Sequence, residues 1–161
     1  MAYSISTGCI GCTACTRVCP VRAIEGERGS QHRIEALRCI ECGACGRICP
    51  RSAVMDDHGV AIPKLPKAEW HKPVFDLSRC IACGACEARC PVSCIRLRDG
   101  KDGGLETWPF LAAPEACVSC GYCAFYCPMS CIRLEAPAPQ TAGGSGGSGG
   151  APDPAAKEVT R

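Results

Sequence analysis

Apolar residues along this chain occur in short runs between polar and turn-forming residues. Typical runs cover residues 23–24, 32–37, 95–97 and 132–134, where Ile, Leu or Ala alternate with charged or polar residues. Runs this short are typical of β-strands, and we expect a short helical turn before each strand. The pattern predicts an α+β fold of small β-α-β repeats, with a turn at residues 99–104, where Gly and Asp cluster.

Two changes in composition divide the chain. Residues 60–70 are rich in Pro and Lys, which disfavours helix, and residues 137–161 are rich in Gly, Ser, Pro and Ala, with too few apolar side chains to build a core. We therefore predict a first unit at residues 1–59 (repeats at about 1–29 and 30–59) and a second at 71–136 (repeats at about 71–100 and 108–136). With a join at 60–70, the two halves could either pack against each other or be two independent units on a flexible tether. The short interval from Cys49 to Cys80 favours packing. The tail at 137–161 is predicted to be disordered.

Sixteen of the eighteen cysteines fall into four copies of one pattern, C-x₂-C-x₂-C-x₃-C-P. Three thiolates spaced in this way on a tight loop can reach three iron corners of a cubane iron–sulfur cluster, and a fourth thiolate must come from elsewhere. The motifs must therefore work in pairs, and four motifs make two pairs. They lie at Cys9/Cys12/Cys15/Cys19, Cys39/Cys42/Cys45/Cys49, Cys80/Cys83/Cys86/Cys90 and Cys117/Cys120/Cys123/Cys127.

Residues 2–135 resemble two bacterial, clostridial-type 2[4Fe–4S] ferredoxins in tandem. The resemblance rests on the four motifs, on Tyr3, Ser4 and Ile5 ahead of Cys9, and on the segment 19–24 that follows. It implies two ferredoxin-like units organised by four [4Fe–4S] clusters, with low reduction potentials and oxygen sensitivity. It also implies that the fourth cysteine of each motif binds the neighbouring cluster. The implied ligand sets are Cys9, Cys12, Cys15 and Cys49 (site 1), Cys39, Cys42, Cys45 and Cys19 (site 2), Cys80, Cys83, Cys86 and Cys127 (site 3), and Cys117, Cys120, Cys123 and Cys90 (site 4).

Zinc and disulfides are the alternative uses of so many cysteines. Zinc sites usually join two short cysteine pairs across a longer gap, whereas here three cysteines follow one another at intervals of three residues, four times. A disulfide scaffold belongs to secreted chains, and residues 1–30 carry no pattern of a secretory signal segment. We therefore favour iron–sulfur clusters in the cytoplasm, where thiols stay reduced.

The formal net charge of +2 counts the cysteines as neutral thiols. Four oxidised clusters with their thiolates add about −8, which brings the protein to about −6, or about −10 when each cluster is reduced. Arginines close to the motifs can offset this charge, although each of them could equally be an ordinary solvated surface residue. They are Arg17, Arg22, Arg47, Arg51, Arg79, Arg89, Arg96 and Arg133. The basic residues are dispersed, so we expect no nucleic-acid partner, and we expect no direct membrane insertion.

Other residues near the motifs suggest packing roles. Cys94 and Cys131 stand where the first two repeats have Ala23 and Ala53, so we expect small buried residues rather than spare ligands or redox thiols. Thr13 takes the place of a glycine that the other three motifs share, and it would be strained if that position needs a positive φ. The aromatic residues near the clusters are predicted to shield them, and the histidines and tryptophans are predicted to be packing or surface residues.

The sequence carries no phosphate-binding loop, nucleophile constellation, or flavin or nicotinamide fingerprint. We therefore expect an electron carrier without a substrate site of its own. It would act as the electron-conducting subunit of a larger oxidoreductase, with redox proteins or catalytic subunits as partners, or as a free polyferredoxin. The alternative is a module that senses iron or oxygen through cluster loss.

Overall fold

The computed structural model describes residues 3–99 and 107–137 of the chain. Short strands and single-turn helices alternate through these residues, which confirms the predicted α+β class. All but the first residue of the predicted tail, and most of the predicted turn at 99–104, lie outside the described residues. In chain order the elements are β1 (Ser4–Ile5), α1 (Ala14–Val18), β2 (Ile24–Glu25), β3 (Arg33–Ile34), α2 (Ala44–Ile48), β4 (Val54–Met55), the 3-10 turn η1 (Lys67–Glu69), β5 (Lys72–Phe75), α3 (Ala85–Ala88), β6 (Ile95–Asp99), β7 (Thr107–Leu111), α4 (Tyr122–Phe125) and β8 (Ile132–Glu135).

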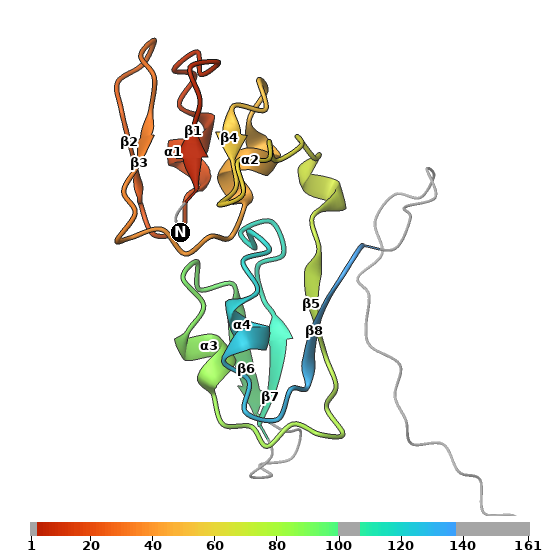
Figure 1. Cartoon of the computed structure of the whole chain (residues 1–161). Helices are drawn as coiled ribbons and strands as arrows, with labels where there is room; N and C mark the ends of the chain where they lie inside the picture. Colours follow the sequence, from red (N-terminus) through yellow and green to blue (C-terminus); the bar gives the residue numbers. More distant parts are fainter. Residues whose placement is uncertain (1–2, 100–106, 138–161) are drawn as a thin grey trace, which may run out of the picture.

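The chain builds the same arrangement twice (Figure 1). In the first half, β1 pairs antiparallel with β4, and β2 pairs with β3. In the second half, β5 pairs with β8, and β6 pairs with β7. The outer pair closes each half, since it joins the first strand to the last, with Ile5 opposite Val54 and Phe75 opposite Ile132. Each half also holds two helices in contact, α1 with α2 and α3 with α4.

The helices differ from the sequence prediction in position. We expected a helical turn after each motif, but each helix lies inside one, around the third cysteine. The reason is a residue with left-handed backbone in front of each helix, where the chain turns sharply and the helix begins: Thr13, Gly43, Gly84 and Gly121, with φ of 62°, 71°, 73° and 79°. The proline after the fourth cysteine then disfavours further helix, because a residue before proline avoids that conformation.

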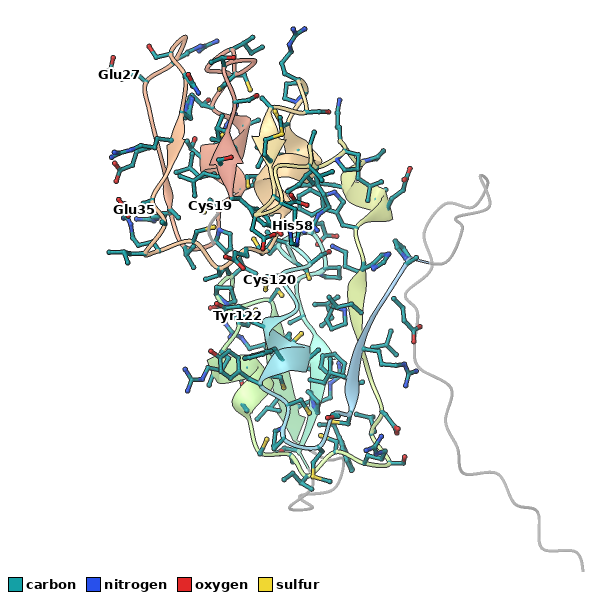
Figure 2. All side chains as sticks on the ribbon, viewed as in Figure 1. Cys19, Glu27, Glu35, His58, Cys120 and Tyr122 are labelled. Atoms are coloured by element: carbon teal, nitrogen blue, oxygen red, sulfur yellow. The ribbon has the colours of Figure 1, made fainter. Side chains whose placement is uncertain are left out.

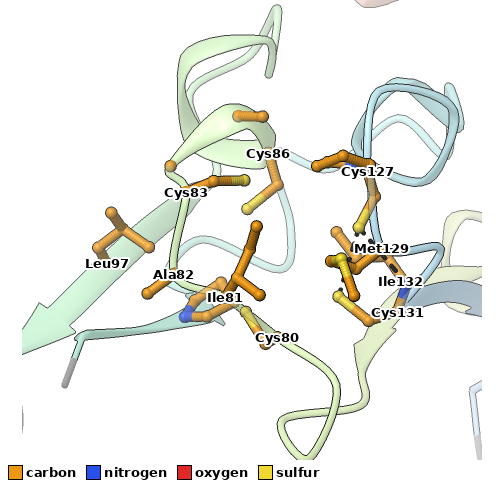
Figure 3. A pocket seen from close by; sticks show the side chains of 14 residues that line it. Cys80, Ile81, Ala82, Cys83, Cys86, Leu97, Cys127, Met129, Cys131 and Ile132 are labelled. Carbon is orange, nitrogen blue, oxygen red and sulfur yellow. Dashed lines mark hydrogen bonds between the residues drawn. The ribbon is translucent and has the colours of Figure 1, made fainter.

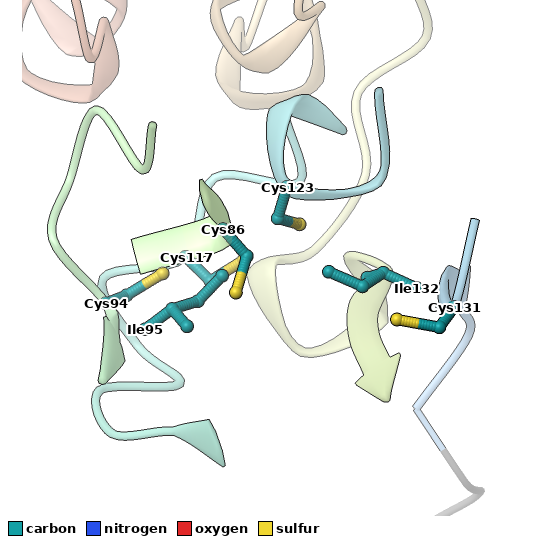
Figure 4. Packing of buried hydrophobic residues seen from close by; sticks show 7 residues of the cluster. All are labelled: Cys86, Cys94, Ile95, Cys117, Cys123, Cys131 and Ile132. Atoms are coloured by element: carbon teal, nitrogen blue, oxygen red, sulfur yellow. The ribbon is translucent and has the colours of Figure 1, made fainter. Parts of the chain in front are cut away.

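Cysteines form much of both interiors. The core of the second half is a buried cluster of five cysteines with Ile95 and Ile132, which Figure 4 shows from close by. The core of the first half combines Cys15 and Cys45 with Ile24 and Val54. Few aliphatic side chains are present in either core, so apolar burial alone gives each half little stability.

The two halves pack against each other. A third buried cluster joins Val18 and Ala44 of the first half, Trp70 of the join and Val118 of the second half. A backbone hydrogen bond from Leu65 N to Arg47 O, 2.9 Å long, holds the join against α2. Trp70, the tryptophan of the join, is almost fully buried. Of the two arrangements that the sequence left open, the structure has the packed one.

No helix in the described ranges is long and apolar enough to cross a lipid bilayer.

Candidate metal centres

Among the described residues, four hollows are each lined by four cysteines of the two motifs in one half. Three of the four come from one motif, and the other is the last cysteine of the second motif in the same half. The hollows contain Cys9, Cys12, Cys15 and Cys49 at site 1, Cys39, Cys42, Cys45 and Cys19 at site 2, Cys80, Cys83, Cys86 and Cys127 at site 3, and Cys117, Cys120, Cys123 and Cys90 at site 4. Figure 3 shows site 3. Each set of thiols that the family resemblance implies thus lines one hollow.

The donor sets fit a cluster. The four hollows are nearly equal in size, about 340, 310, 350 and 300 Å³ for sites 1 to 4 with the solvent at their mouths. Within the described ranges no group of three or more His, Cys, Asp or Glu side chains is placed to hold a single metal ion. Thiols spread around a hollow suit a cubane, because its iron atoms occupy separate corners and each needs its own sulfur ligand.

The loop that presents the first three thiols depends on two left-handed residues that flank the second cysteine of each motif. The residue after it is the one that starts the helix. The residue before it also has positive φ: Gly11 at 62°, Glu41 at 52°, Ala82 at 53° and Ser119 at 54°. Two such residues around one cysteine curl the backbone tightly, which lets thiols three residues apart face one hollow. Position 11 needs glycine for a second reason besides its positive φ, because a Cβ there would lie 2.4 Å from the backbone nitrogen of Ser30.

The fourth cysteine of every motif accepts a hydrogen bond from the backbone N–H four residues later. The N···Sγ distances are 3.3 Å from Ala23 to Cys19, 3.4 Å from Ala53 to Cys49, 3.3 Å from Cys94 to Cys90 and 3.4 Å from Cys131 to Cys127. A third left-handed residue in each repeat precedes the donor: Arg22, Ser52, Ser93 and Ser130. Bonds of this kind stabilise negative charge on a ligand sulfur and tune the potential of a cluster.

Cys94 and Cys131 are buried, as predicted for their packing role, and each also contacts a motif cysteine. The Sγ–Sγ distance is 3.4 Å from Cys94 to Cys90 and 3.3 Å from Cys131 to Cys127. Both side chains line the hollows of sites 4 and 3. Ala23 and Ala53 take the matching positions near Cys19 and Cys49 and have no thiol. Sites 3 and 4 therefore have a second thiol beside one motif sulfur, and sites 1 and 2 do not.

Burial governs the acidity of the inner thiols. It raises the pKa of Cys15 to about 11 and the pKa values of Cys45 and Cys123 to about 12. Burial acts the same way on Cys90 and Cys127, but hydrogen bonds from Cys94 and Cys131, together with those from neighbouring backbone N–H groups, outweigh it, and both pKa values are lowered. The inner thiols of the metal-free chain are therefore protonated at neutral pH, and cluster binding must release those protons.

His32 is a residue near a site that sequence reasoning missed. Its side chain is 2% exposed and lines the hollow of site 1, with Nδ1 3.1 Å from Ser30 O and 3.9 Å from Cys9 Sγ. Because the Ser30 carbonyl only accepts, Nδ1 carries the hydrogen. His32 stands seven residues before the second motif with no partner pattern around it, so no sequence signal could have placed it beside the first.

Among the arginines near the motifs, Arg47 is half-buried and the others are exposed. Arg47 lies at the junction of the halves, and Arg51 lines the hollow of site 1. Arg79 donates to the carbonyl oxygen of Met129, which lines site 3, at 3.2 Å. Arg17 is exposed, and Arg96 and Arg133 form exposed ion pairs with Glu87 and Glu135, which contribute little stability.

Sites 2 and 4 face each other across the junction. Cys42 and Cys120, the second cysteines of their motifs, both pack against the cluster that joins the halves. Burial raises the pKa of Cys42, and charge on Cys120 raises it further, so the two sulfurs lie within electrostatic reach. Figure 2 shows Cys19 of site 2 and Cys120 of site 4 on either side of this junction.

Comparison with known proteins identifies a family whose sequence pattern this chain matches. Models of the 4Fe–4S dicluster domain match residues 8–54, 38–94 and 72–128. Their overlap follows from the repeat, because any two successive motifs look like one domain. No curated protein sequence matches the chain.

Among solved structures, the chain is similar to a chain of the formate dehydrogenase–heterodisulfide reductase–formylmethanofuran dehydrogenase complex from Methanospirillum hungatei. The identity is 21%, the match covers 83% of this chain and 51% of that one, and the TM-score is 0.41. The present chain thus spans about half the length of that protein. With dicluster domains in tandem along residues 8–128, the chain belongs to the family of 4Fe–4S dicluster proteins of the ferredoxin type.

Proposed function

We propose that this chain carries electrons through four [4Fe–4S] clusters, held at sites 1 to 4 by the sixteen motif cysteines. The observation that carries the proposal is the lining of each hollow by four motif cysteines, one of them from the neighbouring motif. A bound [4Fe–4S] cluster takes up and releases one electron at a potential that its surroundings set.

The protein supplies those surroundings. The motif thiolates would fix each cluster, and the backbone N–H groups of Ala23, Ala53, Cys94 and Cys131 would stabilise the charge that reduction adds. The linings are nearly apolar, so few protein dipoles other than these backbone groups face the motif sulfurs. Such a set of sites moves charge without binding a substrate, which fits a carrier rather than a catalyst.

Exposure indicates where partners exchange electrons. All eighteen cysteines lie in the described residues, and Cys83 of site 3 is the one that is exposed. Ile81, beside it in the same loop, is 60% exposed. Sites 2 and 4 are turned toward each other at the junction, so sites 3 and 1 form the outer ends. We propose that redox proteins or catalytic subunits of an oxidoreductase dock at these ends.

The first test is the content of the protein isolated without oxygen. Four cubanes require about sixteen iron and about sixteen acid-labile sulfide per chain, together with reversible reduction at low potential. Zinc with little sulfide would refute the proposal, and about eight iron would leave only one half in use.

Paired substitutions then test the ligand sets. Cys9 and Cys49 are assigned to one site, so Cys9→Ala with Cys49→Ala should remove one cluster and leave about twelve iron. The matched control, Cys39→Ala with Cys49→Ala, breaks sites 2 and 1 and should leave about eight. The reverse result would show that each motif binds its own cluster.

A further inference from the structure

The two halves meet at residues that adjoin the cysteines of sites 2 and 4. Val18 precedes Cys19 of site 2, and Val118 follows Cys117 of site 4; both are buried in the cluster between the halves. The first cysteines of the other motifs have apolar neighbours as well, but Ile10 and Ile81 are 55% and 60% exposed, whereas Val118 is 6% exposed. The junction therefore covers the loop of an inner site and leaves the loops of the outer sites open.

A single guanidinium spans this junction. Arg47 Nη2 donates to Cys42 O at 3.0 Å, in the loop of site 2, and to Val118 O at 2.8 Å, in the loop of site 4. The guanidinium carbon lies 5.0 Å from the centroid of the Trp70 ring, which is 1% exposed. Arg47 Nε is buried and has no hydrogen-bond partner among the described residues.

This charge is placed between two anionic groups. A [4Fe–4S] cluster with four thiolates has a net charge of about −2, or about −3 after reduction. Facing clusters repel each other, and each electron added to one makes reduction of the other harder. The positive guanidinium between the two loops lowers that repulsion. Its partial burial strengthens the effect, because less water screens the charges.

The other motifs provide an internal comparison. The position two residues after the third cysteine holds Arg17, Arg47, Ala88 and Phe125 in the four motifs. Arg17 has the same chemistry as Arg47 in the same helical position, but its side chain is exposed. Only the packing of the halves gives Arg47 its contacts with the second loop.

We propose that Arg47 couples sites 2 and 4: it ties their two loops together and supplies a shared positive charge that eases reduction at both. The inference rests on the proposed electron-carrier function and makes these two sites the inner pair of the molecule. It assigns no such role to Arg17.

The test compares Arg47→Met with Arg17→Met in the full-length holoprotein prepared without oxygen. Both substitutions remove one positive charge and keep an unbranched stem. In R47M we expect unchanged iron and sulfide, with two of the four one-electron components shifted so that their reduction is about tenfold less favourable, which is 59 mV per electron. In R17M we expect the reduction equilibrium of every component to stay within twofold of its value in the unmodified protein.

Spin coupling gives a second readout. In the partly reduced protein, the magnetic interaction between the inner pair should weaken in R47M, because the two loops are no longer tied, and should persist in R17M. Equal shifts in both variants, or no shift and unchanged coupling in R47M, would overturn the inference while leaving the carrier function intact. An unmodified protein that binds no reducible cluster would refute both.

If R47M loses iron and its potentials cannot be compared, Arg47→Lys is the variant that tests the inference. Lysine keeps the charge and an aliphatic stem beside Trp70 but replaces the planar guanidinium with a compact ammonium. If the reduction equilibria of all components in Arg47→Lys stay within twofold of the unmodified protein, the role of the charge is supported. If reduction of two components becomes tenfold less favourable, the role of the charge is contradicted.

Discussion

The thiol of Cys94 lies 3.4 Å from the sulfur of Cys90, a motif cysteine that lines site 4. The same relationship joins Cys131 to Cys127 at site 3, at 3.3 Å. In each pair the backbone N–H of the later residue also points at the earlier sulfur. When the motif sulfur is a cluster ligand, it is ionised, so the buried thiol is the hydrogen-bond donor and adds a second bond beside the amide.

We expect Cys94→Ala and Cys131→Ala to keep all four clusters and to lower one reduction potential each. A weak hydrogen bond to a charged ligand contributes about 0.5–1.5 kcal/mol, equivalent to about 20–60 mV for one electron. Redox titration with iron analysis measures this.

Alanine is a well-matched replacement, since the first two repeats bury Ala23 and Ala53 at the same position. A loss of about four iron in either variant would instead identify the residue as a ligand.

Thr13→Gly should stabilise the protein. Thr13 has φ of 62° and makes no capping bond to α1, so its side chain adds strain of about 1–2 kcal/mol at the position where the other motifs have glycine. After the entropic cost of glycine, a gain of about 0.5–1 kcal/mol remains. Thermal unfolding of the holoprotein without oxygen reports the change.

The reverse substitution serves as its control. A Cβ at Gly84 would meet Leu97 Cδ1 at 3.6 Å, an ordinary contact, so Gly84→Ala should cost about 1–2 kcal/mol through backbone strain alone. If Gly84→Ala were neutral, positive φ would not limit stability in these loops.

Gly46→Ala should loosen the join from α2. A Cβ at Gly46 would lie 2.4 Å from the Cβ of Ile62, and overpacking of this kind costs about 1–3 kcal/mol. Hydrogen exchange at Ile62 N, which bonds to Val54 O, should quicken. Ile62→Gly removes that Cβ, so Gly46→Ala should cost less stability in the Ile62→Gly background than in the unmodified protein. An equal cost in both backgrounds would contradict the steric explanation.

Removal of the clusters should unfold both halves. Their cores consist largely of cysteines, and the strands β1 to β4 are only two residues long, so little holds the fold without the metal. Anaerobic chelation followed by far-UV circular dichroism tests this, with rebuilding of the clusters as the control. A native spectrum after complete loss of iron would show that the chain folds alone.

Much of this protein can be predicted from its sequence. The cysteine spacing predicted the four motifs and their tight loops, because such loops are formed by residues close together in the sequence. The assignment of each fourth cysteine to the neighbouring motif was implied by the family resemblance and not by the spacing. The same local rule flagged Thr13 as a strained position, and the structure has the positive φ there. The helix positions were wrong because the tight loop, and not the run of apolar residues, determines where each helix begins.

Only the tertiary structure decided how the two halves meet. Arg17 and Arg47 are equivalent in the local sequence, yet one is exposed and the other bridges two sites, and His32 reaches site 1 from a distant segment. Site 4 is the site that faces site 2 across the junction, and nothing in the sequence indicated that. Local geometry is encoded over a few residues, but contacts between Arg47 and Val118 join residues 71 apart and depend on the packing of the whole chain.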